Sequence, residues 1–183
     1  MGAYEKSKTL AERAAWDFVA QLAPEEAFEL VCLNPVYVLG PSLSGIENAS
    51  NEIVGKLLRR DMPGVPRLHF GLVDVRDVAA AHVSALTSEQ AAGERFLLSA
   101  EPMWMKEIAS TLDEAGYRVP MTQLPNWLVR LATLFDPILR LVTRHLGRPF
   151  QVSSAKARSV LGWQTRPVPE TVLETARSIM PTP

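Results

Sequence analysis

Hydrophobic and polar positions alternate between strand-like and helical patterns along the first 115 residues. Three short apolar runs predict buried strands: 28–33, 68–73 and 94–99. Four stretches between or beside them have helical composition and periodicity: 4–22, 50–60, 75–86 and 106–115. This alternation predicts an α/β layer architecture. Because a parallel sheet is covered on both faces, three strands alone would leave these elements short of partners.

The pattern changes after Pro125. Residues 127–146 predict a helix with Arg130, Arg140 and Arg144 on one face and apolar side chains on the other, kinked or split at Pro137. Residues 153–161 and 169–180 predict two short helices, with Ser153 and Pro169 as start signals. We expect the 127–146 stripe to pack on its own domain rather than on a membrane.

Composition narrows the class of protein. The chain has 183 residues, 47% of them apolar, and a net charge of −1 without any basic block, which argues against nucleic-acid binding. A single cysteine, Cys32, excludes an internal disulfide framework and fits a reducing compartment, so we expect a cytoplasmic protein. The charged first residues predict no signal peptide, and no apolar stretch is long enough to predict a spanning helix.

Candidate acid–base chemistry lies at the start of the chain. Tyr4 and Lys8 stand four residues apart, so a helix places them on one face. A free tyrosine titrates near pH ~10, and a nearby cation favours its phenolate form. Such a pair can donate or accept a proton near neutral pH. The spacing alone is weak evidence, because Tyr and Lys also occur four apart on many helices by chance.

Four sequence segments, which follow one another in the order found in a known family, support a functional interpretation of Tyr4 and Lys8. The first is 4–12, Tyr-x-x-x-Lys followed by Ala11-Glu12; the others are 34–42, ending in Gly40-Pro41; 73–79 with His82; and Lys156 with 161–163. Together they resemble the extended short-chain dehydrogenases/reductases, above all their dihydroflavonol-reductase-like branch. The resemblance covers nearly all of this chain but only about the second half of the family's length.

The resemblance implies a role for each matching position. Tyr4 would donate the proton to a substrate carbonyl, and Lys8 would assist it and bind the nicotinamide ribose of NAD or NADP. The backbone of Pro35, Val36, Tyr37 and Val38 would lie against the nicotinamide. Ser50 would lie near the cofactor phosphates, and a plain helix N-cap is an equal alternative for it. The segments after Pro41 and from 103 to 150 would recognise a small carbonyl or alcohol substrate.

The resemblance also implies a fold, and it shows which features of the family have no counterpart in this sequence. Residues 1–100 would form part of a Rossmann-like doubly wound parallel sheet, and residues 101–183 a mostly helical substrate-binding region. The family's glycine-rich pyrophosphate turn and its upstream catalytic Ser or Thr have no counterpart here, so we expect a truncated form. A nucleotide-sugar epimerase or dehydratase remains an alternative. So does a non-catalytic module that forms a homodimer or needs a partner chain.

Other polar residues have structural interpretations. His69, His82, His145 and Cys32 lack metal-ligand spacing, so we predict no metal site, and we expect His82 to be packed or capping. Asp74 and Asp77 could act as paired acids, but a helix capping box explains both better. We expect Trp163 to anchor the core.

Overall fold

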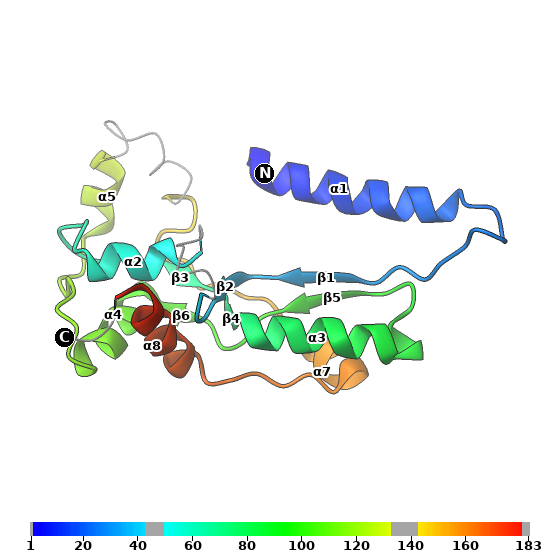
Figure 1. Ribbon diagram of the computed structural model, residues 1–183. Coiled ribbons are helices and arrows are strands. Elements are labelled where there is room, and N and C mark those ends of the chain that lie inside the picture. The colour runs from blue at the N-terminus through cyan, green and yellow to red at the C-terminus, as the bar shows by residue number, and fades with distance from the viewer. Residues whose placement is uncertain (1, 43–49, 133–142, 181–183) are drawn as a thin grey trace.

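The computed structural model describes residues 2–42, 50–132 and 143–180 (Figure 1). Its helices are α1 (Ala3–Ala20), α2 (Glu52–Leu58), α3 (Val75–Thr87), α4 (Met105–Glu114), α5 (Asn126–Ala132), α7 (Ala155–Leu161) and α8 (Val168–Ile179), with a 3-10 turn η1 (Glu89–Ala91). Its strands are β1 (Cys32–Pro35), β2 (Tyr37–Leu39), β3 (His69–Phe70), β4 (Leu72–Asp74), β5 (Arg95–Leu98) and β6 (Met103–Trp104). The predicted α/β class is therefore confirmed.

Two parallel strand pairs carry the middle of the molecule. β1 pairs with β5, with Pro35 opposite Leu98, and β2 pairs with β4. Val36 joins β1 to β2: its N–H donates to the Leu98 carbonyl at 3.1 Å, and the Tyr37 N–H donates to the Gly71 carbonyl at 3.2 Å. The chain thus passes at Val36 from one parallel neighbour, β5, to another, β4. β3 and β6 form a separate antiparallel pair.

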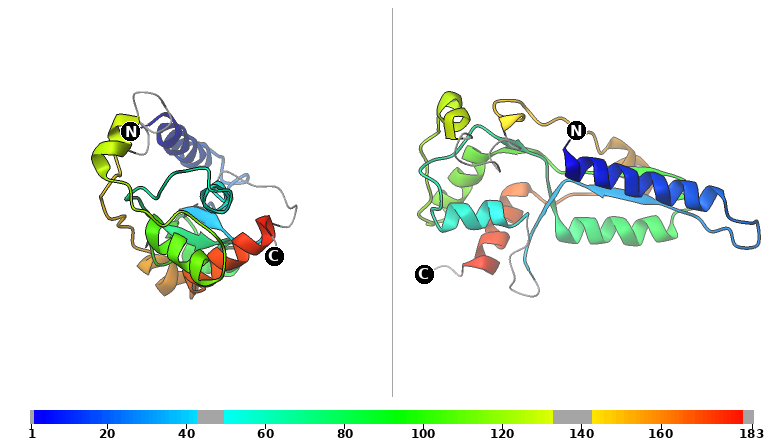
Figure 2. Two further views of the ribbon diagram at one scale, coloured as in Figure 1. Left: turned by 90° about the vertical axis from the view of Figure 1, so that its left-hand side faces the viewer. Right: turned by 90° about the horizontal axis from the view of Figure 1, so that it is seen from above.

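Helices cover the β1–β5 pair from both sides. α1 lies on one side, while α3 and α7 lie on the other, where α3 contacts β1 and α7 contacts β5 (Figures 1 and 2). Val73, Phe96, Leu98 and Trp163 belong to the core between the sheet and this second layer, which confirms Trp163 as a core anchor. α1 has no buried residue, so its hold on the sheet does not depend on a deep apolar contact.

A second core joins α2, α4 and α8. It is centred on buried aliphatic side chains from all parts of the chain, among them Leu39, Leu57, Leu72, Ile108 and Val172. Because burial of one such side chain contributes about 1.5–3 kcal/mol, these helices are held mainly by packing. The predicted boundary near residue 100 stays a prediction, and this core takes residues from both sides of it.

Some predicted strands differ from the observed ones. The first strand begins at Cys32 rather than Phe28, whose side chain is exposed, and the second run is split by Gly71 into β3 and β4. β2 and β6 were not predicted as separate strands. The physical reason is that strands of two or three residues depend on neighbours distant in the sequence rather than on a local hydrophobic period.

The C-terminal helices are mostly where the pattern predicts them. α7 and α8 are confirmed, and α7 ends at Gly162, whose φ of 61° suits a glycine C-cap. The predicted helix 127–146 corresponds in part to α5, and Pro137 lies outside the described residues. Across residues 2–42, 50–132 and 143–180, the helices are all too short or too polar to cross a bilayer.

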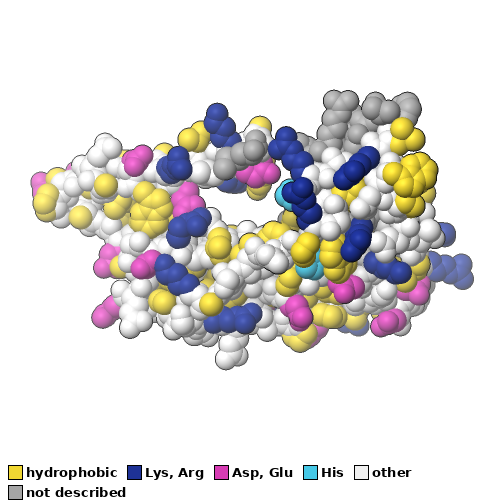
Figure 3. All heavy atoms as spheres, turned by 180° about the vertical axis from the view of Figure 1, so that it is seen from behind, with side chains coloured by type: hydrophobic (Ala, Val, Ile, Leu, Met, Phe, Trp, Pro, Cys, Tyr) yellow, Lys and Arg dark blue, Asp and Glu magenta, His cyan; other side chains and the backbone are white. Residues whose placement is uncertain are grey.

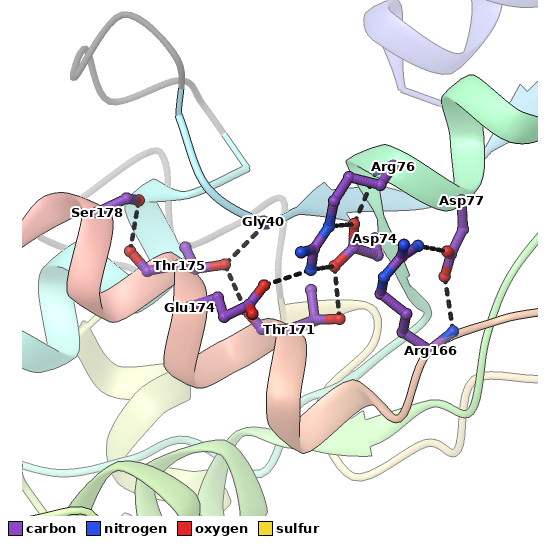
Figure 4. A network of polar contacts seen from close by, with 9 residues as sticks. All are labelled: Gly40, Asp74, Arg76, Asp77, Arg166, Thr171, Glu174, Thr175 and Ser178. Carbon is purple, nitrogen blue, oxygen red and sulfur yellow. Dashed lines mark hydrogen bonds and ion pairs between the residues drawn. The ribbon is translucent and has the colours of Figure 1, made fainter.

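The Asp74 carboxylate joins three elements at the end of β4 (Figure 4). It caps α3 by accepting the Arg76 N–H at 2.8 Å, and it accepts the Arg76 side chain at 2.9 Å on Oδ1 and 2.7 Å on Oδ2. From α8, the Thr171 hydroxyl donates to Oδ2 at 2.9 Å, and Glu174 forms an ion pair with Arg76. The Asp74 residue is 2% exposed. Burial alone would raise the pKa of this carboxyl, but these hydrogen bonds hold it below its usual value.

Asp77 corrects one prediction. Asp74 is the N-cap as expected, but Asp77 does not complete a capping box. Its carboxylate instead accepts the Arg166 N–H at 2.8 Å and pairs with the Arg166 guanidinium (Figure 4). Its backbone carbonyl accepts the Trp163 indole N–H at 2.7 Å. Asp77 therefore fastens the segment between α7 and α8 to α3, a long-range role that local spacing does not reveal.

We expect Asp74→Asn to lower the free energy of unfolding by about 1.5–3 kcal/mol at neutral pH, because it weakens charge-assisted hydrogen bonds to a buried group. Since the folded pKa of Asp74 is depressed, this stability is present above the unfolded pKa and is lost as pH falls through the folded pKa. The difference between the two proteins should thus shrink in acid. Urea unfolding at several pH values tests this, with exposed Asp113→Asn as control; a pH-independent difference would contradict it.

Candidate functional site

One face of α1 carries the candidate acid–base pair. Tyr4, Lys8 and Glu12 follow one another at intervals of four residues, so they line up along the helix. The Lys8 Nζ lies over the Tyr4 ring, 5.6 Å from the ring centroid, within the range of a cation–π contact. The Tyr4 side chain is 72% exposed. The two side chains thus face each other and are accessible, which is the arrangement that the proposed proton transfer needs.

These side chains open onto a cavity of about 480 Å³ between α1 and the strands. Its lining comes from α1, from the carboxyl end of β1 and from β5: Tyr4, Glu5, Lys8, Thr9, Glu12, Leu33, Asn34, Pro35 and Arg95. Figure 3 shows an opening beneath the N-terminal end of α1, seen from behind. The cavity therefore runs along β1 to its carboxyl end at Pro35, and it meets β5 at its first residue, Arg95. Ligands of open α/β sheets bind beyond the carboxyl ends of parallel strands, so the Pro35 side of the cavity is the side expected to face a cofactor.

The structure brings together only some of the predicted cofactor residues. Pro35 lines the cavity with Tyr4 and Lys8, whereas Val36, Tyr37 and Val38 are not among its lining residues. The N–H groups of Val36 and Tyr37 already donate within the sheet and are therefore used. The predicted nicotinamide contact of this segment stays a prediction.

Ser50 lies outside this cavity. α2 begins at Glu52, with Asn51 rather than Ser50 in the N-cap position, and the Ser50 carbonyl accepts the Ile53 N–H at 3.4 Å. The N-cap prediction for Ser50 was therefore wrong by one residue. Its predicted place near the cofactor phosphates stays a prediction.

Tyr37 forms an aromatic pair beside the cavity. Its ring meets Phe70 edge to face, with the centroids 5.4 Å apart. Burial raises the pKa of the Tyr37 phenol, and the negative charges that Tyr4 and Glu5 can carry raise it further. Neither Tyr37 nor Phe70 is among the residues that line the cavity, so the contact joins β2 to β3 rather than forming a wall of the cavity.

Glu12 joins α1 to β5. Arg95 donates to both of its carboxylate oxygens, at 2.7 Å from Nε and 3.1 Å from Nη2. The Arg95 hydrogen bond lowers the pKa of Glu12 against the opposing effect of burial. Sequence reasoning noted Glu12 only within the Ala-Glu pair and missed Arg95. The four-residue spacing from Lys8 could have indicated Glu12, but no local pattern in the sequence indicates Arg95.

The other candidates keep structural roles. His82 was expected to be packed or capping: it is exposed rather than packed, and its Nδ1 lies 2.8 Å from the Val78 carbonyl oxygen of its own helix. Cys32 is half-buried, and burial raises the pKa of its thiol. Lys156 pairs with Glu94 and lies over the Phe96 ring. In the part of the chain that the structure describes, no three His, Cys, Asp or Glu residues gather as a metal site would require.

Curated relatives match nearly the whole chain. It is 31% identical over 186 residues to the NADPH-dependent methylglyoxal reductase GRE2 of Saccharomyces cerevisiae, covering 98% of this chain and 51% of the relative. It is 33% identical to cinnamoyl-CoA reductase CAD2 of Medicago truncatula, covering 96% and 47%. The chain thus spans about half the length of the curated relatives it matches. No protein-family model matches it.

Solved structures match over the same extent. The yeast reductase Gre2 complexed with NADPH has a TM-score of 0.75 at 29% identity, covering 97% of this chain and 51% of that one. A nucleoside-diphosphate-sugar epimerase from Pseudomonas aeruginosa has a TM-score of 0.74 at 18% identity, covering 96% and 54%. At that identity the second likeness concerns the fold alone.

We expect one tyrosine, Tyr37, to titrate above the ordinary tyrosine range of about pH 10. Because its folded pKa is raised, the stability that it contributes is present below the unfolded pKa and is lost as pH rises through the folded value. Near-ultraviolet absorbance titration measures the phenolates. Tyr37→Phe should remove the late step, and Glu5→Gln should move it to lower pH, while exposed Glu25→Gln should leave it unchanged. A late step that persists in Tyr37→Phe would contradict the assignment.

Proposed function

We propose a function on the premise that this chain belongs to the extended short-chain dehydrogenase/reductase family, whose carboxyl-terminal part it matches. The proposal is that it forms the acid–base and substrate side of an NAD(P)-dependent carbonyl reductase. The observation that carries it is the meeting of Tyr4 and Lys8 above a cavity that ends at Asn34 and Pro35.

The chemistry assigned to Tyr4 is proton transfer. Its hydroxyl would donate the proton that the carbonyl oxygen takes up as the carbonyl is reduced to an alcohol. The Lys8 ammonium, beside the ring, would stabilise the phenolate that this transfer leaves behind. A bound nicotinamide would supply the hydride. The exposure of Tyr4 fits a group that must touch substrate.

We propose that the cavity receives the nicotinamide end of the cofactor. Lys8 would hydrogen-bond the ribose, and Pro35 would form the wall at the end of β1. The names of the yeast reductase and of its solved structure specify NADPH, and we propose NADPH for this chain. We keep residues 1–100 as the cofactor-facing part and residues 101–183 as the substrate-facing part.

The substrate that we propose is a small apolar aldehyde or ketone. We propose that the Tyr37–Phe70 pair, whose rings pack edge to face, adds an aromatic surface to the substrate site that residues 101–183 mainly form. The relatives named above act, by their names, on methylglyoxal and cinnamoyl-CoA. An epimerase or dehydratase activity has only a fold likeness behind it, so we do not favour it.

Location and assembly are part of the proposal. The single cysteine, Cys32, fits a cytoplasmic protein. The exposed apolar side chains of α1 and α3, Leu10, Phe18, Val83 and Leu86, offer surfaces for a second copy or for another part of the reductase.

We expect Tyr4→Phe to lower kcat by about 10²–10⁴-fold while cofactor affinity is retained, because only the proton donor is removed. The assay follows NADPH oxidation with aldehydes, using the chain joined to the dinucleotide-binding part of the yeast relative. Buried Tyr117→Phe, remote from the cavity, is the control and should retain activity.

A direct binding experiment distinguishes the alternative. The chain as it stands is mixed with NADPH or NADH, and cofactor fluorescence is followed. If the folded chain binds neither cofactor and the joined protein is inactive, the reductase proposal fails and a non-catalytic interaction module becomes the better description. Equal activity of Tyr4→Phe and its parent would likewise remove Tyr4 from the mechanism.

A further inference from the structure

On the charged face of α1, the Tyr4 ring and the Glu12 carboxylate are alternative partners for the Lys8 ammonium. Lys8 and Glu12 stand four residues apart, the spacing at which opposite charges on a helix ordinarily attract each other. Within the described part of the chain, however, Lys8 lies over the Tyr4 ring and the ion pair of Glu12 is made with Arg95. A carboxylate that could have drawn Lys8 away from Tyr4 is thus occupied from the other side of the cavity.

We propose that Glu12 and Arg95 are a positioning pair: Arg95 holds the Glu12 carboxylate away from Lys8 and so keeps the Lys8 ammonium on Tyr4. The effect of this pair on catalysis rests on the proposed function, in which Tyr4 is the proton donor. Neither residue touches the reacting atoms in this proposal. Both act through Lys8.

The geometry of the pair supports this role. Arg95 binds Glu12 through two nitrogens and two oxygens, which fixes orientation as well as distance. The Glu12 side chain is 19% exposed and that of Arg95 is 53% exposed, so the carboxylate is the more enclosed partner. The lowered pKa of Glu12 keeps it ionised across the physiological range.

Two further groups orient the carboxylate. The Trp16 indole N–H donates to the same Oε1 at 3.5 Å, one turn further along α1. The Asn34 amide lies close enough to lower the pKa of Glu12, although no hydrogen bond of ordinary geometry joins them. Glu12 therefore accepts hydrogen bonds from α1 and β5, and the Asn34 amide of β1 lies nearby. Because α1 has no buried residue, this cluster also sets how the helix lies on the strands.

A positioning role predicts other effects of substitution than a purely structural link between α1 and β5. If the pair only fastened α1, then Glu12→Gln and Arg95→Met would release the helix alike. If Arg95 shields Lys8, then Arg95→Met leaves a free carboxylate beside Lys8, whereas Glu12→Gln leaves none. Removal of both charges should then relieve the defect that Arg95→Met causes.

The test uses the chain itself, with its lysines labelled by ¹³C at the ε carbon, and NMR. In the parent the Lys8 signal carries a ring-current shift from Tyr4, which Tyr4→Leu removes. We expect Arg95→Met to lose this shift, Glu12→Gln to keep it, and Glu12→Gln/Arg95→Met to recover it. Arg95→Lys should retain it in part, and Arg158→Met, an exposed arginine on α7, should not change it.

Several outcomes would overturn the proposal. One is a Lys8 signal that is unchanged in Arg95→Met. Another is loss of the Lys8 ring-current shift in Glu12→Gln, which would show that the pair only links α1 to β5. This result can be read from Glu12→Gln alone, even if Arg95→Met does not fold. In the joined reductase, kcat should fall on the order of tenfold in Arg95→Met, with KM for the carbonyl little changed, and recover in the double variant. An inactive parent with the NMR pattern intact would refute the proposed function and not the pairing.

Discussion

The buried carboxylate of Asp74 is the constraint on which the arrangement of the described elements depends. It lies at the end of β4, caps α3 through the Arg76 N–H and receives a hydrogen bond from Thr171 of α8. β4 is the parallel neighbour of β2, and β2 continues directly from the strand that carries Asn34 and Pro35. A buried charge without partners would be strongly unfavourable. The hydrogen bonds of Asp74 therefore favour the arrangement in which α8, α3 and the β2–β4 pair are in register, and β2 in turn continues from the strand that lines the candidate site.

The two charged clusters of the molecule differ in what they constrain. Asp74 is 2% exposed and is held by groups from α3 and α8, next to cores packed on both sides. Glu12 and Arg95 are partly exposed and link a helix without buried residues to β5. Partly exposed ion pairs are individually weak because solvent screens them. The strands and the α2–α4–α8 core thus form the stable part, and α1 is the element whose position responds most to its charged contacts. The candidate acid–base residues Tyr4 and Lys8 lie on α1, whereas the opposite wall of the cavity lies on the strands.

Local pattern predicted what local interactions determine. The seven described helices follow from composition, period and end signals, and Asp74 at the end of a strand and before an alanine-rich run was recognisable as an N-cap. The face shared by Tyr4 and Lys8 also followed from spacing alone. What could not be predicted depends on residues far apart in sequence. Asp77 finds Arg166, Glu12 finds Arg95, and the two-residue strands β3 and β6 exist only as each other's partner. No period or motif marks such pairs, because their geometry is set by the packing of other elements.

The same division explains why the cofactor residues were only partly placed. The resemblance assigned a nicotinamide contact to four consecutive backbone positions, but Val36 is where the chain changes parallel neighbours, so its N–H and that of Tyr37 are used within the sheet. At the carboxyl end of β1, the buried Asn34 Nδ2 is a polar group that has no hydrogen-bond partner. In the proposed function, the task of this site is to orient the nicotinamide end of the cofactor beside Tyr4. Binding energy for the diphosphate would have to come from the part of the relatives that this chain does not span. Orientation and proton transfer on one side, and phosphate binding on the other, are separable tasks, and the described residues are suited to the first.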